Sequence, residues 1–146
     1  VLGAYYVMAR EFSTLPLVVG IPIGFMVAAI LHANNVRDID SDRAVNKRTL
    51  AVLFGLRAAR WEYRLLVGGA YVAVLVLIAV RIMPVTTILV TLTLPEAFKL
   101  IRIIDTSRDN ALLHQAQGRT ARLHGAFGFW LVIGWALGLT TSAFLV

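Results

Sequence analysis

The sequence of 146 residues contains no cysteine, which excludes disulfide bonds and metal sites built from thiolates. Histidine is also scarce, and His32, His114 and His124 lack the spacing of a zinc-binding helix motif. Any metal ion that the chain binds must therefore be held by oxygen atoms.

Charged residues are few as well: they make up 15% of the sequence, whereas 59% of the residues are hydrophobic and the mean hydropathy is +0.79. These values are too apolar for an ordinary soluble domain and predict a membrane protein. Fourteen basic residues against eight acidic ones give a formal net charge of +6. The basic residues alternate with long apolar runs instead of forming one stripe, which argues against nucleic-acid binding.

The sequence has no initiator methionine and no charged segment before its first apolar run. It therefore shows no signal peptide, and we expect it to be a piece of a longer chain. No repeat, low-complexity tract or long linker divides it, so residues 1–146 are expected to belong to a single domain.

Four apolar runs are candidates for membrane-spanning helices, because a bilayer core of about 30 Å requires about 20 apolar residues. They are residues 15–33, 65–80, 82–98 and 123–146. The third run is rich in threonine and carries Glu96 after Pro95, so we expect it to bend and to face other helices. With residues 1–9 as the end of a further helix, the prediction is an all-α, multi-pass transmembrane bundle of about four spans plus part of another.

The basic residues lie in alternate connections between these runs: the connections after the first and third runs are basic, whereas the opposite ones contain only Arg10 and Arg81. The positive-inside rule then predicts that the basic connections lie in the cytoplasm and the C-terminus outside. We therefore expect a multi-pass protein of the cell (inner) membrane.

The most informative segment is residues 32–52, which follows the first run and contains NNVRDIDSDR at 34–43. No helix-breaking residue occurs before Asp42, so the helix can continue, and Asn34, Asp38 and Asp42 are then on one side of it. Two carboxylates one turn apart repel each other unless a cation lies beside them. Magnesium is the natural candidate, because it prefers oxygen ligands and commonly binds one or two carboxylates together with water and phosphate oxygens.

Three basic residues follow the carboxylates, namely Arg43, Lys47 and Arg48, and such cations can bind phosphate oxygens. A diphosphate site at the end of a membrane helix points to an isoprenoid diphosphate, whose tail lies in the bilayer. Asp40 is on the other side of the helix and is assigned to solvent or to a pair with Arg37. The alternative is a solvated charged loop whose basic residues only follow topology.

The segment resembles the second aspartate-rich motif of the UbiA-type membrane prenyltransferases, through NNVRDIDSDR at 34–43 and KRTLAV at 47–52. Within that family it is most similar to the 1,4-dihydroxy-2-naphthoate polyprenyltransferases of menaquinone biosynthesis. GAYY at 3–6 and TARLH at 120–124 agree with the family pattern, so the resemblance covers nearly the whole chain.

The resemblance implies a nine-helix bundle with two aspartate motifs facing each other across a cavity. Residues 1–146 are then the C-terminal part of a single transmembrane prenyltransferase domain, and a missing N-terminal half carries the first motif. The resemblance makes Asp38 and Asp42 the catalytic residues and the magnesium ligands. The substrate-binding residues that it implies are Asn34, Asn35, Arg43, Lys47 and Arg48.

The implied reaction is transfer of a polyprenyl group from a polyprenyl diphosphate to an aromatic acceptor, 1,4-dihydroxy-2-naphthoate, with magnesium as the cofactor and the lipid bilayer as the environment. The acceptor could instead be hydroxybenzoate, haem or a lipid. The acidic face could also serve a membrane transporter or an ion-binding subunit. With only one motif, the chain by itself is expected to be inactive.

Val45 and Asn46 stand where an Ala-Gly pair is usual in the family. Asparagine adopts the left-handed conformation less freely than glycine, so the turn is expected to differ in geometry from that of the family. His32 is expected to be hydrogen-bonded rather than catalytic. Glu96 is an intramembrane acid and hence a site candidate, although Lys99 is close enough in sequence to neutralise it.

Overall fold

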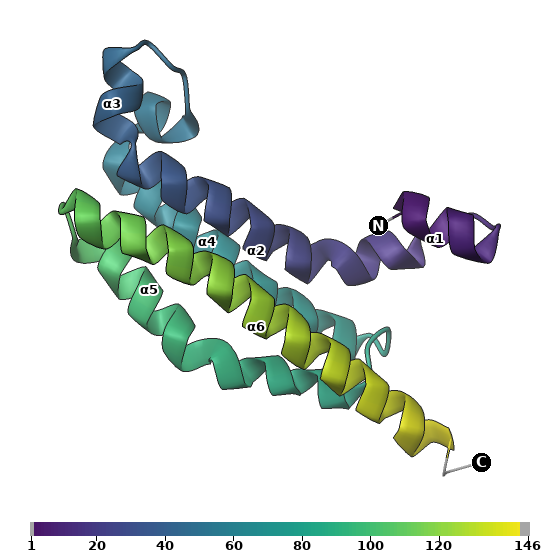
Figure 1. Cartoon of the computed structure of the whole chain (residues 1–146). Helices are drawn as coiled ribbons and strands as arrows, with labels where there is room; N and C mark the ends of the chain where they lie inside the picture. Colours follow the sequence, from purple (N-terminus) through teal and green to yellow (C-terminus); the bar gives the residue numbers. More distant parts are fainter. Residues whose placement is uncertain (1, 144–146) are drawn as a thin grey trace.

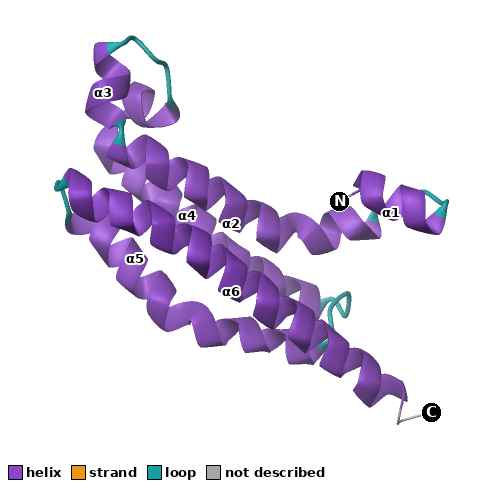
Figure 2. Cartoon of the chain, in the orientation of Figure 1, coloured by secondary structure: helices purple, strands orange, loops and turns teal. Residues whose placement is uncertain are grey.

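The computed structural model describes residues 2–143, and side chains within residues 2–140. Figure 2 shows helices joined by short loops, and the described part of the chain contains no strand. The elements in order are α1 (Leu2–Ala9), α2 (Leu15–Arg37), α3 (Ile39–Ala44), α4 (Leu50–Ala79), the 3-10 helix η1 (Val85–Thr93), α5 (Leu94–Thr106) and α6 (Asn110–Ala143). The all-α prediction is confirmed.

Three helices are long and apolar enough to cross a membrane, namely α2, α4 and α6 as far as Thr140. They contain three of the four predicted runs, but α4 and α6 begin about four turns before the apolar run does, at Leu50 and Asn110. The apolar run marks only the part of a helix suited to lipid, whereas backbone hydrogen bonding continues into the polar residues beside it. The last three residues of the run at 123–146 lie outside the described residues.

The third predicted run, residues 82–98, does not form one α-helix. Pro84 precedes η1, and α5 begins at Leu94 with Pro95 in its first turn. Proline has no backbone N–H, so it starts a helix readily and interrupts one that continues past it. Within η1, the hydroxyls of Thr87 and Thr91 donate to carbonyls three residues earlier, which matches the tighter 3-10 repeat. The predicted bend is confirmed at the junction of η1 and α5.

The bundle is built around α6, which lies against α2 on one side and against η1 and α5 on the other, with α4 behind (Figure 1). Buried hydroxyls of α4 are paired across these interfaces. The Tyr63 hydroxyl lies 2.8 Å from Oγ1 of Thr120 on α6, and the Tyr71 hydroxyl lies 2.7 Å from Oγ1 of Thr93 on η1. Such pairing stabilises a bundle whose interior offers no water to polar groups.

The approach of η1 to α6 depends on a small residue. Oγ1 of Thr86 donates to the carbonyl of Gly134 at 2.5 Å, and a Cβ on Gly134 would lie 2.6 Å from the Cα of Thr87. No larger side chain fits there without moving a backbone, as is common where membrane helices pack closely. This contact lies in the half of the bundle that contains α1 and the C-terminal part of α6, whereas α3 lies at the opposite end (Figure 1).

Candidate functional site

The acidic segment continues the path of α2 with one local break. The N–H of Asp38 donates to the carbonyl of Asn34 at 3.0 Å, and the N–H of Asp42 donates to that of Asp38 at 2.8 Å. Asp38 itself has φ −93° and ψ 9°, and it separates α2 from α3. The helical spacing is therefore kept, so Asn34, Asp38 and Asp42 follow one side of the helical path as predicted, although the helix is not continuous.

Arg37 holds the first carboxylate. Its Nε and Nη2 donate to the two carboxylate oxygens of Asp38 at 2.6 Å each, and Nη2 also donates to Oδ1 of Asn34 at 2.6 Å. The hydrogen bonds from this guanidinium favour the charged carboxylate and hold the pKa of Asp38 below its usual value. Asp38 is thereby fixed in place as an anion.

The same guanidinium connects the acidic segment to α6. Nη1 of Arg37 donates to Oε1 of Gln117 and lies 3.0 Å from Nδ1 of His114. These two residues are 77 and 80 positions away in the sequence, and the sequence analysis did not identify either as part of the site. The three-residue spacing of His114 and Gln117 places both on one face of a helix, and this is the one sequence signal that could have linked them. The spacing does not show which other helix that face contacts.

Asp42 lies in a different environment. Its side chain is 8% exposed, and Oδ1 accepts a hydrogen bond from Nζ of Lys47 at 3.0 Å. Oδ2 is buried and has no hydrogen-bond partner among the described residues. A buried carboxylate oxygen without a partner is costly, and a cation or a protonated ligand group removes that cost.

The donor set fits magnesium. Within the described residues, no three or more histidine or acidic side chains are placed to hold a metal ion. Magnesium needs no such cage, because it is usually bound by one or two carboxylates and completes its shell with water and phosphate oxygens. The orphaned oxygen of Asp42 is the position where such an ion would meet the protein.

The turn after α3 brings Lys47 to Asp42. Asn46 has φ 55°, in the left-handed region, and its N–H donates to the carbonyl of Arg43 at 3.2 Å. The N–H of Lys47 donates to the carbonyl of Asp42 at 2.9 Å, which completes a Schellman cap. Asparagine is the residue that most readily takes the place of glycine there. The turn therefore forms with Asn46 in the position where the family pattern has glycine.

A cap and a kink then set the direction of α4. Oγ1 of Thr49 accepts a hydrogen bond from the N–H of Val52 at 3.3 Å, which caps the first turn. Gly55 has φ 81° and ψ 168°, a conformation open to glycine alone, and it separates this first turn from the rest of α4. The chain can therefore fold back at the end of the bundle, where α3 packs on α4.

The remaining predicted residues are not gathered at Asp42. Arg43 lies 3.5 Å from Asp40, whose side chain is 93% exposed, so the assignment of Asp40 to solvent is confirmed. The alternative pairing of Asp40 with Arg37 is wrong, because Arg37 binds the adjacent Asp38. Asn35 is half-buried and Arg48 is exposed, and neither side chain has a hydrogen-bond partner within the described part of the chain.

Two other ionisable residues have structural partners. His32 is buried, with Nε2 2.7 Å from the carbonyl of Ala59 and Nδ1 3.6 Å from Glu62, so its expected hydrogen bond is confirmed. Glu96 accepts a hydrogen bond from Nε of Arg119 at 2.8 Å and is therefore neutralised by α6 rather than by Lys99.

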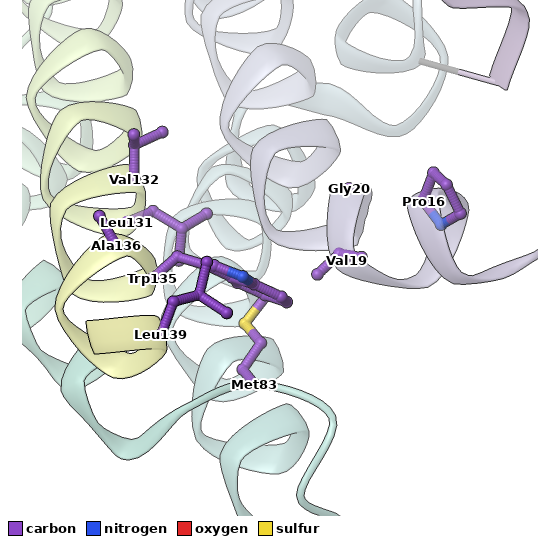
Figure 3. A pocket seen from close by; sticks show the side chains of 9 residues that line it. All are labelled: Pro16, Val19, Gly20, Met83, Leu131, Val132, Trp135, Ala136 and Leu139. Atoms are coloured by element: carbon purple, nitrogen blue, oxygen red, sulfur yellow. The ribbon is translucent and has the colours of Figure 1, made fainter. Parts of the chain in front are cut away.

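An apolar pocket of 480 Å³ lies at the other end of the bundle. Figure 3 shows Leu131, Trp135 and Leu139 of α6 and Met83 directed towards the space beside Val19 of α2. The remaining lining residues are Pro16, Gly20, Val132 and Ala136. Along α2, Gly20 and Asp38 are 18 residues apart, which is about 27 Å of helix. The two ends therefore offer a polar site and a separate surface for an apolar group.

Comparison with known proteins places the chain in a family. Residues 1–119 match the model of the UbiA prenyltransferase family, so the chain belongs to that family. "UbiA prenyltransferase domain-containing protein 1" is 37% identical to it in Danio rerio and 34% in Homo sapiens, in each case over 92% of this chain and 38% of the relative. The "1,4-dihydroxy-2-naphthoate octaprenyltransferase" of Bacillus subtilis is 27% identical over 92% of this chain and 43% of that protein.

The family resemblance seen in the sequence is thus confirmed, and identity to the two vertebrate proteins is higher than to the bacterial enzyme. The chain spans less than half the length of these relatives. No solved structure matches it.

Proposed function

We propose that the chain is the C-terminal part of a membrane prenyltransferase domain that transfers a polyprenyl group from a polyprenyl diphosphate to an aromatic acceptor. The observation that carries this proposal is the environment of Asp42. One of its carboxylate oxygens is bound by Lys47, and the other is buried without a partner among the described residues. Asp42 belongs to the segment that resembles the second aspartate-rich motif of the family. This arrangement suits a ligand made of a divalent cation and an anionic diphosphate.

Asp38 and Asp42 are the proposed magnesium ligands, with Asn34 beside them as a further oxygen donor. Magnesium, when bound, would neutralise charge on the diphosphate and so favour its departure. Both oxygens of Asp38 accept hydrogen bonds from Arg37, but each carboxylate oxygen has a second lone pair. Asp38 can therefore stay bound to Arg37 and still face a metal ion.

Cations of the chain are proposed to bind the phosphate oxygens that the metal does not cover. Lys47 lies beside Asp42 with a half-exposed side chain, so its ammonium can exchange a carboxylate contact for a phosphate contact. Arg48 follows it and is exposed, which leaves its guanidinium available. Asn35 and Arg43 keep their predicted substrate-binding roles only if ligand binding brings them to the side of Asp42.

Release of diphosphate would leave an electron-poor allylic carbon, which an electron-rich aromatic ring attacks. The ring would then lose the group at the attacked position, which for dihydroxynaphthoate is the carboxylate, released as carbon dioxide. Apolar surroundings protect such a carbon from water. The apolar pocket near Met83 is the proposed place for distal isoprenoid units, because a long prenyl chain held at the acidic site must run along the bundle. The acidic end is proposed to face the cytoplasm, since it contains the basic connections.

The proposed acceptor is 1,4-dihydroxy-2-naphthoate, which would place the reaction in menaquinone biosynthesis. Its support is the activity named for the Bacillus subtilis relative and the similarity of the motif at 34–52. The vertebrate relatives are named after the domain and not after an acceptor, so hydroxybenzoate, haem and lipid acceptors should be tested in the same assay.

The test uses the full-length protein in membranes with labelled polyprenyl diphosphate and each acceptor, with and without magnesium. We expect magnesium-dependent transfer to dihydroxynaphthoate, loss of transfer in Asp42→Asn, and full activity in Asp40→Asn, the control on the other side of α3. Asp42→Asn with wild-type activity would contradict the site. Binding of magnesium with no binding of prenyl diphosphate would contradict the enzyme and favour a transporter.

The 146-residue chain by itself is a second test. We expect it to be inactive, because the family resemblance implies that an upstream half carries the first aspartate motif. Turnover by the purified chain alone would contradict that division of the site.

A further inference from the structure

A second polar pocket lies at the same end of the bundle as the acidic site but on the other side of α3. We call it the arginine pocket; its volume is 290 Å³. Its lining comes from the junction of α2 and α3, from α4 and from the connection between α5 and α6. The lining residues are Val36, Arg37, Ile39, Asp40, Arg43, Leu56, Ser107, Arg108, Asn110 and Leu113.

The arginine pocket is distinct from the candidate metal site. At about 100° per residue, Asp40 is about 160° around the helical path from both Asp38 and Asp42, and Arg43 is about 140° from Asp38 and about 100° from Asp42. Neither of those two carboxylates lines the pocket. Arg37 lines the pocket and also binds the carboxylate of Asp38, but the other charged lining residues, Asp40, Arg43 and Arg108, are not part of the candidate metal site.

The charge of the arginine pocket favours an anion, since three guanidinium groups line it against one carboxylate. Arg37 is already bound by Asp38, but the other two are available. Arg43 is 58% exposed and lies 3.5 Å from the almost fully exposed Asp40, and such a surface pair is weak. Arg108 is exposed and forms no ion pair with any described residue. Two guanidinium groups can therefore turn to a ligand at little cost.

The rest of the lining narrows the class of anion. Val36, Ile39, Leu56 and Leu113 form an apolar wall, so the ligand that fits has an apolar part beside its charge. Asn110 is the first residue of α6, but the N-terminus of this helix is capped by Asp109, whose Oδ1 accepts from the N–H of Ala111 at 2.8 Å, so the arginines supply the positive charge of the pocket. Arginine-rich pockets between helices at the basic side of a membrane protein suit phosphate-bearing lipid headgroups.

We propose that the arginine pocket binds the phosphate group of an anionic phospholipid, with Arg43 and Arg108 as the phosphate ligands and the glycerol and acyl region against the apolar wall. This proposal goes beyond prenyl transfer and does not depend on it. It assigns Arg43 to a lipid site, because Arg43 lines the arginine pocket and lies beside Asp40.

The test titrates the purified full-length protein with phosphatidylglycerol and with phosphatidylcholine and counts bound lipids by native mass spectrometry. We expect tighter binding of phosphatidylglycerol, weakened about fivefold in Arg108→Gln, because one arginine near an anionic headgroup has that effect. Arg102→Gln is the matched control: it removes the same charge from an exposed position on α5 outside the pocket and should leave binding unchanged. Asp40→Asn should strengthen binding, since it removes the carboxylate found among the described lining residues and releases Arg43.

Equal binding of phosphatidylglycerol by the wild type and Arg108→Gln would overturn the proposal, as would an equal loss in Arg102→Gln. A competition experiment with inorganic phosphate shows whether the pocket binds a lipid headgroup or free phosphate. Displacement of phosphatidylglycerol by millimolar phosphate in the wild type but not in Arg108→Gln would support a site that binds a phosphate group. Binding of phosphate with no preference for phosphatidylglycerol would overturn the assignment to lipid.

Discussion

The two ends of this bundle are held together by different interactions. At the end with the acidic segment, charged groups join elements distant in sequence: Arg37 reaches His114 and Gln117 on α6, and Arg64 of α4 lies 2.8 Å from Asp105 of α5. At the other end, η1 and α6 meet through small residues and close backbone contact at Gly134. Charge therefore organises the end where phosphate groups are proposed to bind, and shape organises the end that contains the apolar pocket.

This contrast predicts that substitutions at the acidic end change activity more than stability, and that those at the apolar end do the reverse. The largest expected effect is on activity in Asp42→Asn. Removing the charge of a group that contacts a reacting ligand typically lowers the rate about 100-fold or more. The melting temperature should change little, because asparagine keeps the volume and can still accept a hydrogen bond from Lys47. Radiolabelled prenyl transfer measures the activity, and thermal unfolding in detergent measures the stability. A large fall in melting temperature would contradict the expected difference between the two ends.

At the apolar end, Gly134→Ala is expected to destabilise the protein by about 1–3 kcal/mol, because the added methyl group has to displace the backbone at Thr87. Thermal unfolding in detergent measures this loss. The matched control on the same helix is Gly118→Ala, where no atom other than the neighbouring backbone of the helix itself lies within 4 Å of the added methyl group. That variant should be neutral or slightly more stable, and equal losses in both would contradict the proposed close approach.

A smaller effect is expected from the turn that positions Lys47. Asn46→Ala should cost about 1 kcal/mol, because alanine enters the left-handed region less readily than asparagine. Asn46→Gly should be at least as stable as the wild type, since glycine has no Cβ to strain. Denaturant unfolding separates the two variants. Equal stability of the alanine and glycine variants would show that the Schellman cap does not form.

The smallest expected effect is that of pH on the ion pair of Arg37 and Asp38. Hydrogen bonds from Arg37 lower the pKa of Asp38, so the folded state binds its proton less readily than the unfolded state does. The stability that it contributes is complete above about pH 4, the ordinary pKa, and is lost as pH falls through the lowered value. The melting temperature of the wild type should therefore fall towards that of Asp38→Asn below about pH 4. A constant difference between them down to pH 2 would contradict this.

Much of the candidate site was predictable because its members are close in sequence. Four-residue spacing alone places Asn34, Asp38 and Asp42 along one side, and Lys47 follows within the next turn. The spacing could not show that Asp38 would be held by its neighbour Arg37 while Asp42 would be buried, because those outcomes depend on α6 and on the cap at Asn46. Asp40 and Arg37 were a plausible pair in sequence; the side chain of Arg37 turns to Asp38 and to α6 instead.

The sequence by itself determined the helical class, the apolar runs and the acidic motif, because hydrophobicity and helical periodicity act over a few turns. The helix boundaries follow from local signals that the apolar runs do not include, such as the cap of Thr49 and the prolines Pro84 and Pro95. Only the tertiary structure decided which α6 residues meet Arg37, because His114 and Gln117 are 77 and 80 positions away and reach it only when the helices pack. For the same reason the arginine pocket, built from α2, α3, α4 and the connection before α6, has no counterpart in any local pattern of the sequence.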